Sequence, residues 1–186
     1  MFRRFENNRP RLSQSEIVVS IVILLVFILI AIPFFNRMFE NIERTAMQQI
    51  IRQLNAAANI KMAEYVALDK LKEFPEQLRS NPVNWLDVRD LKGWDRYLGE
   101  VEQVDFEQLE EQNWIYDKSR GRLIYKVDYP ELLINNDPIQ NRIQFKVKMD
   151  YIDFNSNGKF DASTDTINGL IIEAAHPFRW KQHSDE

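Results

Sequence analysis

Nineteen successive residues near the N-terminus form the most hydrophobic stretch of the chain. Ile17 to Phe35 contain one hydroxyl, that of Ser20, and no charged side chain. At about 1.5 Å per residue, a helix of this length spans roughly 28 Å, close to the hydrocarbon thickness of a bilayer. A buried core helix would carry polar positions every few residues, and a cleaved secretory signal would have a shorter apolar run that ends in small residues. The pattern therefore predicts a transmembrane helix over residues 16–35.

The helical pattern continues beyond this apolar run, because neither glycine nor proline occurs between Pro33 and Pro75. We predict an amphipathic continuation of the helix over residues 36–72. Its apolar stripe is either the seam of a coiled-coil homodimer or, as we prefer, a face that packs on a sheet. The stripe consists of Phe39, Ile42, Ala46, Ile50, Leu54, Ala57, Ala58, Met62 and Tyr65.

The second half of the chain changes to the period of β-strands. Arg142 to Tyr151 alternates apolar and polar residues, and Gly169 to Ala174 reads as a last strand. Trp114–Tyr116 and Arg122–Val127 flank a short turn and predict a β-hairpin. Residues 74–112 are expected to be irregular with short helices, and the acidic stretch 105–111 to be a solvated helix face. These elements predict an α+β fold in which the long helix packs on a small antiparallel sheet, with a globular domain and C-terminal tail over residues 73–186.

Charge is distributed unevenly along the chain. Residues 1–15 have a net charge of +3, from Arg3, Arg4, Arg9 and Arg11 against Glu6, and the remaining residues have −7, which together give the −4 of the whole chain. The acidic body argues against nucleic-acid binding. Basic residues collect on the cytoplasmic side of a membrane span. We therefore expect a single-pass inner-membrane protein with residues 1–15 in the cytoplasm and residues 73–186 in the periplasm.

Few residues suggest catalysis. The chain has no cysteine, which excludes disulfides and thiolate zinc sites, and its two histidines are His176 and His183. No nucleophile elbow, zinc-protease motif or phosphate-binding loop is present. We expect a non-enzymatic protein without a small-molecule substrate.

One loop has the spacing of a cation site. Residues 153–161 follow the pattern D-x-N-x-N-G-x-x-D, in which oxygen ligands alternate and a glycine permits the turn. Position 12 is Thr164 instead of a bidentate glutamate, so the loop is not an EF-hand, although the next residue is an aspartate. The alternative is a metal-free turn rich in Asn and Gly. The predicted ligands of a structural Ca²⁺ ion are Asp153, Asn155, Asn157, the Lys159 carbonyl, Asp161 and Asp165.

Two further motifs resemble those of type IV pilins and pseudopilins. Glu16 precedes the apolar run and Pro33 follows 17 residues later, within Ala31-Ile32-Pro33, as in the N-terminal helices of that family. The segments Trp114-Ile115-Tyr116-Asp117 and Gly121-Arg122-Leu123-Ile124-Tyr125 are similar to a hairpin of minor pilin-like proteins, including those of mannose-sensitive haemagglutinin (MSHA) pilus biogenesis. The resemblance implies a pilin-like fold and lateral pairing of helices through Glu16 and Pro33.

The resemblance implies a partner for Glu16 but leaves its identity open. In the family this carboxylate neutralises the N-terminal amine of a neighbour; here the partner would be that amine or an arginine such as Arg11 of an adjacent chain. Alternatively, Glu16 lies among lipid headgroups. Prepilin peptidase cuts after a glycine, whereas Arg11 precedes Leu12, the position that corresponds to the first mature residue. Processing of the N-terminus therefore stays open.

Three functions follow from these patterns. The first is a minor pilin-like or pseudopilin-like component of a type IV (MSHA-type) pilus or a type II secretion-like machine, with other pilin-like or assembly proteins as partners. The second is a bitopic periplasmic adaptor or sensor that dimerises through residues 36–68. The third, a membrane-tethered enzyme, would depend on His176 or the carboxylates of residues 105–111.

Overall fold

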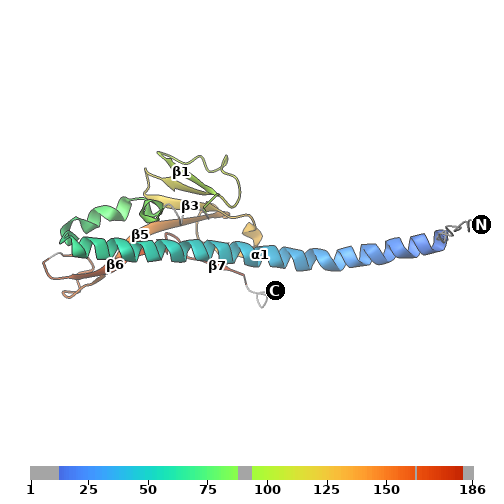
Figure 1. The fold of residues 1–186 in the computed structure, drawn as a ribbon, viewed down its shortest axis with the longest axis horizontal. Helices are drawn as coiled ribbons and strands as arrows, with labels where there is room; N and C mark the ends of the chain where they lie inside the picture. Colours follow the sequence, from blue (N-terminus) through green and yellow to red (C-terminus); the bar gives the residue numbers. More distant parts are fainter. Residues whose placement is uncertain (1–12, 88–93, 162, 182–186) are drawn as a thin grey trace, which may run out of the picture. The chain divides into compact units, whose positions relative to one another are not determined.

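A computed structural model describes residues 13–87, 94–161 and 163–181 (Figure 1). The chain divides into two compact units, residues 1–41 and 42–186. Residues 1–12 of the predicted cytoplasmic segment and residues 182–186 of the predicted tail lie outside the described residues. The helices are α1 (Gln14–Ala67) and the 3₁₀ segments η1 (Leu71–Arg79), η2 (Pro82–Trp85) and η4 (Pro130–Leu132); the strands are β1 (Tyr97–Val101), β2 (Trp114–Asp117), β3 (Arg122–Lys126), β4 (Leu133–Asn135), β5 (Arg142–Ile152), β6 (Thr166–Ala174) and β7 (Phe178–Trp180).

The long helix is confirmed. α1 runs without a break through Pro33 and ends at Ala67, five residues before the predicted end. Asp69, with φ of 53°, follows the helix, and the amide of Lys70 donates to the carbonyl oxygen of Tyr65 at 2.9 Å. A left-handed residue after the last turn is a common way to end a helix.

The main sheet is mixed, which corrects the prediction of a purely antiparallel sheet. Its strand order is β1-β2-β3-β5-β6. Three of the four pairings are antiparallel, but β1 pairs with β2 in parallel. Parallel neighbours need a crossover instead of a tight turn. Residues 102–113 form that crossover, and β1 arises within a stretch that was expected to be irregular.

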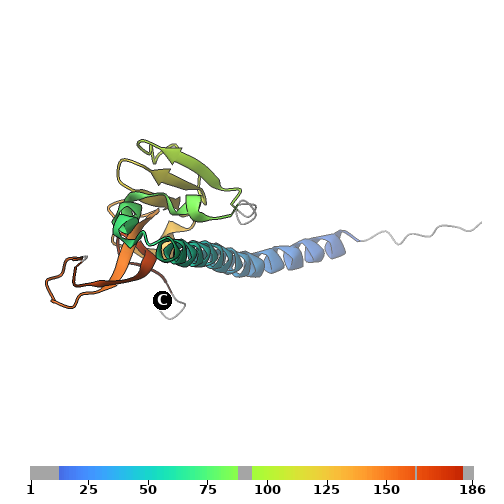
Figure 2. The same ribbon diagram turned by 60° about the vertical axis from the view of Figure 1, so that its left-hand side comes forward.

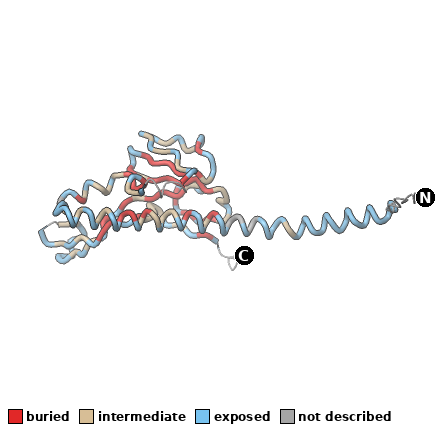
Figure 3. The backbone as a smooth tube through the Cα atoms, in the orientation of Figure 1, coloured by how far each residue is buried: buried red, intermediate tan, exposed pale blue. Residues whose placement is uncertain are grey.

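The crossover also corrects the prediction of a solvated helix over residues 105–111. These residues form bends and turns, and Leu109 is buried against Ile115 and Ile124. The sheet is therefore covered on both faces at β2 and β3, which explains why every residue of β2 is buried. Figure 3 shows these buried strands in red.

A second, two-stranded sheet was not predicted. β4 pairs with β7 antiparallel, with Leu133 opposite Trp180 and Asn135 opposite Phe178. Each strand has three residues, which is too short to show an alternating pattern.

The remaining strand predictions are confirmed with small shifts. β5 buries Ile143, Phe145, Val147 and Met149, the predicted inner face. β6 begins at Thr166, three residues before the predicted start. The β5–β6 loop projects away from the rest of the sheet, as Figure 2 shows in orange and red.

Within residues 42–186, α1 packs on the sheet through a face that the predicted stripe describes only in part. Leu54 and Ala58 are fully buried, but Ile42 is 54% exposed and Ala46 is exposed, while Glu43 and Met47 are buried. The reason is the helix period. At 100° per residue, positions 43 and 47 fall within about 20° of position 54, whereas 42 and 46 fall about 120° and 80° away. The side chain of Phe39 lies outside those described.

An asparagine of α1 covers the outer edge of the sheet. The Asn55 side-chain oxygen accepts the amide of Ile172 in β6 at 2.9 Å, and its nitrogen donates to the Ile51 carbonyl at 2.9 Å. β6 is an edge strand with unpaired amides. The helix therefore satisfies one of these edge amides.

Candidate functional site

The first candidate site is the apolar part of α1. Residues Gln14–Phe35 form a helix that is long and apolar enough to cross a membrane. Its large side chains are exposed, from 44% at Ile28 to 70% at Leu29, and Figure 3 draws this part of α1 in pale blue. None of the described residues 13–35 is buried. Exposure of so large an apolar surface to water is energetically unfavourable.

Glu16 forms a capping box at the start of this helix. Its carboxylate accepts the backbone amide of Ser13 at 2.7 Å, and the Ser13 hydroxyl accepts the amide of Glu16 at 3.3 Å. A reciprocal pair of this kind satisfies backbone amides that have no partner within the helix. Arg11, the predicted partner on an adjacent chain, lies outside the described residues. A carboxylate has several lone pairs, so the cap leaves Glu16 able to accept another donor.

The second candidate site is the predicted Ca²⁺ loop between β5 and β6. Its side-chain oxygens accept amides of the same loop. The Asp153 carboxylate accepts the amides of Asn157 and Gly158 at 3.2 and 2.7 Å, and the Asn157 oxygen accepts that of Lys159 at 2.7 Å. Gly158 has φ of 74°, the left-handed turn expected of it. These contacts match the metal-free turn that the sequence left as the alternative.

The other end of the loop is held by Asp165. Its carboxylate accepts the amide of Phe154 at 3.2 Å and that of Asp161 at 2.8 Å, so it bridges the two ends. The Asn155 oxygen accepts the amide of Asn157 at 3.0 Å. In the described parts of the chain, no three Asp, Glu, His or Cys side chains are grouped so that they could hold a metal ion. Ca²⁺ binding therefore stays a prediction.

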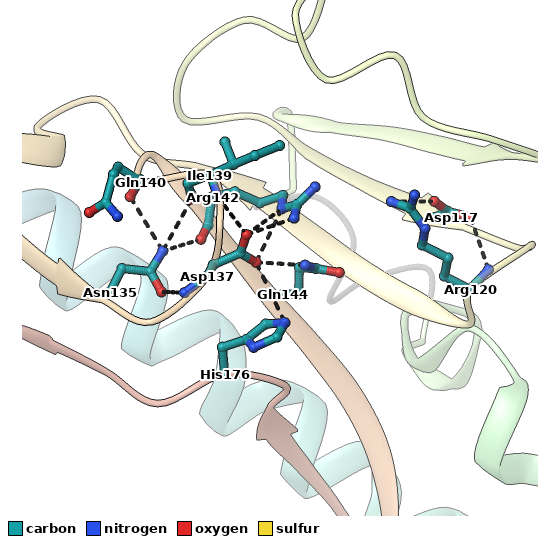
Figure 4. Close-up of polar contacts among 9 residues, drawn as sticks. All are labelled: Asp117, Arg120, Asn135, Asp137, Ile139, Gln140, Arg142, Gln144 and His176. Atoms are coloured by element: carbon teal, nitrogen blue, oxygen red, sulfur yellow. Dashed lines mark hydrogen bonds and ion pairs between the residues drawn. The ribbon is translucent and has the colours of Figure 1, made fainter.

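The third candidate is a buried charge cluster around Asp137, which the sequence analysis did not single out (Figure 4). Asp137 is 2% exposed and binds Arg142, whose Nη2 lies 2.6 Å from Oδ1 and whose Nε lies 3.1 Å from both carboxylate oxygens. Gln144 Nε2 donates to Oδ2 at 2.6 Å, the Ile139 amide donates at 2.9 Å, and His176 Nε2 lies 3.9 Å away.

This cluster is structural. Burial by itself raises the pKa of the Asp137 carboxyl, but the hydrogen bonds from Arg142, Ile139 and Gln144 outweigh burial and hold the pKa below its usual value. The carboxylate joins the loop after β4 to β5. Alternation along β5 marks Arg142 and Gln144 as facing away from the main core, but only the folded loop buries them against Asp137.

The hairpin motif that carries the resemblance is also structural in this chain. The Asp117 carboxylate accepts the Ser119 hydroxyl at 2.6 Å and the Arg120 amide at 3.0 Å, and Arg120 also lies beside it in Figure 4. Gly121 has φ of 61°, and the rings of Trp114 and Tyr125 are in contact at a tilt of 34°, with centroids 4.6 Å apart. These residues therefore fix the turn and the core.

Glu43 is a second buried carboxylate, at a position outside the apolar stripe that the sequence predicts. It is 5% exposed; its Oε1 accepts the Tyr125 hydroxyl at 2.8 Å and the Asp128 amide at 2.9 Å, whereas its buried Oε2 has no donor among the described residues. Burial raises the pKa of Glu43, and the charge of Asp128 adds to this, although the two hydrogen bonds act against it. A strict helical period could have indicated that position 43 faces the sheet.

No family model, curated protein or solved structure matches this chain. Its structure defines an α+β protein with an apolar N-terminal helix and a mixed five-stranded sheet. Of the three candidate sites, the apolar helix is the one that exposes a continuous row of large hydrophobic side chains.

Proposed function

We propose that this protein is a non-enzymatic, minor pilin-like or pseudopilin-like component in the assembly of a type IV pilus, of the MSHA type, or of a type II secretion-like machine. The observation that carries the proposal is the two-part nature of α1. Its first part is an exposed apolar helix, and its second part packs on a sheet through Leu54 and Ala58. A helix of the first kind associates with similar helices in a bilayer by close packing.

The proposal places the protein in the inner membrane as a single-pass protein. The basic residues of segment 1–15 support a cytoplasmic N-terminus. Residues 73–186 then lie in the periplasm, where their acidic surface recognises other assembly proteins. A fusion of alkaline phosphatase to the C-terminus tests this orientation, because the enzyme is active only outside the cytoplasm. An inactive fusion at normal expression contradicts it.

The rival function is a bitopic adaptor or sensor that dimerises through residues 36–68. Burial of Leu54, Ala57 and Ala58 within residues 42–186 supports the pilin-like proposal, because the stripe that would form a dimer seam is occupied by the sheet. A dimer through this stripe would require the helix to leave the sheet.

Photo-crosslinking from two positions separates these functions. A photoreactive residue at Ile23 samples the apolar helix, and one at Ile60, which is 71% exposed, samples the second part of α1. We expect Ile23 to crosslink to a small pilin-type subunit and deletion of the gene to reduce pilus assembly or secretion. A homodimer crosslinked at Ile60, with no assembly defect on deletion, would support the adaptor.

Glu16 and the N-terminus have their own test. Glu16→Gln removes the charge but keeps an oxygen that can accept the Ser13 amide. If Glu16 pairs with a cation of a neighbour, the variant loses the Ile23 crosslink while remaining in the membrane; if Glu16 lies among headgroups, the crosslink is unchanged. Mass spectrometry of the mature protein reports whether the chain starts at Leu12, as processing by prepilin peptidase requires.

A further inference from the structure

The two edges of β5 are paired over unequal lengths. On one side β6 pairs with β5 from Phe145 to Ile152. On the other side β3 pairs only with residues 142–145, because the chain turns away before β3 begins. Residues 146–152 therefore have no strand partner on the β3 side within the described parts of the chain.

The ladder shows which backbone groups point to this free edge. The Val127 amide donates to the Asn141 carbonyl at 2.8 Å on the β3 side, and the Ala175 amide donates to the Gln144 carbonyl at 2.7 Å on the β6 side. Backbone groups of alternate residues point to alternate sides of an antiparallel strand. Counting by twos, Val147 and Met149 direct their N–H and C=O groups towards the free edge, where none of the described turn or loop hydrogen bonds reaches them.

A hollow of about 350 Å³ lies against this edge. Successive side chains of a strand point to opposite faces, so a hollow bordered by four successive residues must lie at the edge of the strand and not over one face. The opposite wall comes from η1 and from the β5–β6 loop. The lining residues are Pro75 and Leu78 of η1, Lys146, Val147, Lys148, Met149 and Tyr151 of β5, and Phe160 of the loop.

The charge and shape of the hollow indicate which kind of ligand it would bind. Both charged residues in its lining are lysines, and the Nζ atoms of Lys146 and Lys148 share a single carboxylate, Glu173, at 3.1 and 3.2 Å. In the described parts of the chain these two lysines form ion pairs with this one carboxylate, so the three side chains together carry a net charge of +1. η1 and β5 both border the hollow, so a partner that pairs with this edge must enter between them as a single extended chain.

We propose that the free edge of β5 binds an extended segment of a partner protein, with alternating acidic and apolar side chains, by strand addition. The main chain of the segment pairs with Val147 and Met149. Its apolar side chains lie on the side of Met149 and Phe160, and its carboxylates lie on the side of Lys146 and Lys148. Strand addition uses the backbone for affinity and alternate side chains for specificity. The proposal rests on the pairing of β3, β5 and β6 and on the hollow beside η1, and it does not depend on the pilin-like function.

The probe is a capped seven-residue peptide of alternating valine and glutamate, titrated into the full chain in lipid nanodiscs. Two further versions carry N-methyl groups on the amides of either the valines or the glutamates. Since only one set of amides can face β5, we expect one version to bind at least tenfold more weakly and the other within twofold of the parent. Equal loss in both versions, or no saturable binding at millimolar peptide, would overturn the proposal.

Two protein-side measurements locate the site. Peptide binding is expected to slow hydrogen exchange of the Val147 and Met149 amides at least tenfold. The Lys148 side chain is 54% exposed. Lys148→Glu should weaken binding of the valine–glutamate peptide at least tenfold and strengthen binding of a matching valine–lysine peptide. Ile134→Glu, on the second sheet, is the control and should change the binding of neither peptide. Protection at β1 in place of β5, or an unchanged charge preference in Lys148→Glu, would contradict strand addition at this edge.

Discussion

The hydroxyl of Tyr125 donates a hydrogen bond of 2.8 Å to Glu43, and so joins the central strand β3 to α1 across 82 residues of sequence. The same carboxylate oxygen accepts the amide of Asp128. Two donors on one oxygen and none on the other leave a buried carboxylate only partly satisfied. Attachment of this part of α1 to the sheet therefore depends on the protonation of Glu43.

The first prediction concerns the pH dependence of stability. The pKa of Glu43 is raised in the folded protein above the ordinary value of 4.5. The stability that this group contributes is therefore complete below pH 4.5 and is lost as the pH rises through the folded-state pKa. Glu43→Gln stays neutral and should gain stability relative to the parent across that window, by about 1.4 kcal/mol for each unit of raised pKa.

Chemical unfolding at intervals from pH 4 to 8, followed by tryptophan fluorescence of the full chain in detergent, measures this difference. Glu64→Gln is the matched control, because Glu64 lies on the same helix but is exposed. Parallel pH profiles for the parent and Glu43→Gln would show that Glu43 does not titrate differently on folding.

The second prediction concerns the packing of α1 on the sheet. Leu54 is fully buried in the main core. Leu54→Ala should lower the free energy of unfolding by about 2–5 kcal/mol, because it removes buried methyl groups and leaves a cavity. Ile60→Ala, on the exposed side of the same helix, should change it by less than about 0.5 kcal/mol. Equal small effects would mean that the helix does not rest on the sheet in solution.

The third prediction concerns the Asp137–Arg142 pair. The Asp137 side chain is buried, at 1% exposure, and the Arg142 side chain is mostly covered, at 11%. Asp137→Ala leaves the guanidinium without a carboxylate and should lower stability at pH 7 by about 3–5 kcal/mol. Because the folded-state pKa of Asp137 lies below 3.8, the stabilisation is present above that pH and is lost as the pH falls through the folded-state value.

Thermal unfolding of Asp137→Ala, Arg142→Ala and the double variant measures the coupling. The double variant should lose less stability than the two single losses combined, because neither charge is left buried alone. Asp150→Ala, at an exposed position of the same strand, is the control. Additive losses would show that the two side chains do not stabilise each other.

The fourth prediction concerns Ca²⁺ at residues 153–165. Carboxylate oxygens that accept loop amides keep lone pairs for a cation. Calorimetric titration of the full chain with Ca²⁺ is expected to release or absorb heat and to raise the melting temperature, and Asp153→Ala should abolish both effects. Asp150→Ala lies just outside the loop and should leave them intact. If the parent shows neither heat nor a shift in melting temperature, the loop does not bind Ca²⁺ and is a hydrogen-bonded turn without metal.

The sequence alone determined the elements whose pattern is long and regular. The apolar run 17–35 is too long for a strand, the helix that continues from it has a helical period, and β5 alternates over ten residues, so α1, the β2–β3 hairpin and β5 could all be predicted. Loop residues were also recognised where glycine and asparagine define the turn, as at Gly158.

Only the tertiary structure decided which side chains meet across the chain. The parallel pairing of β1, the three-residue strands β4 and β7, and the burial of Glu43, Asp137 and Leu109 depend on contacts between residues far apart in sequence. Local pattern reports the face of an element but not what covers that face. The free edge of β5 also depends on the tertiary structure, because no single segment encodes strand pairing. The edge is free where the pairing of β5 with β3 ends.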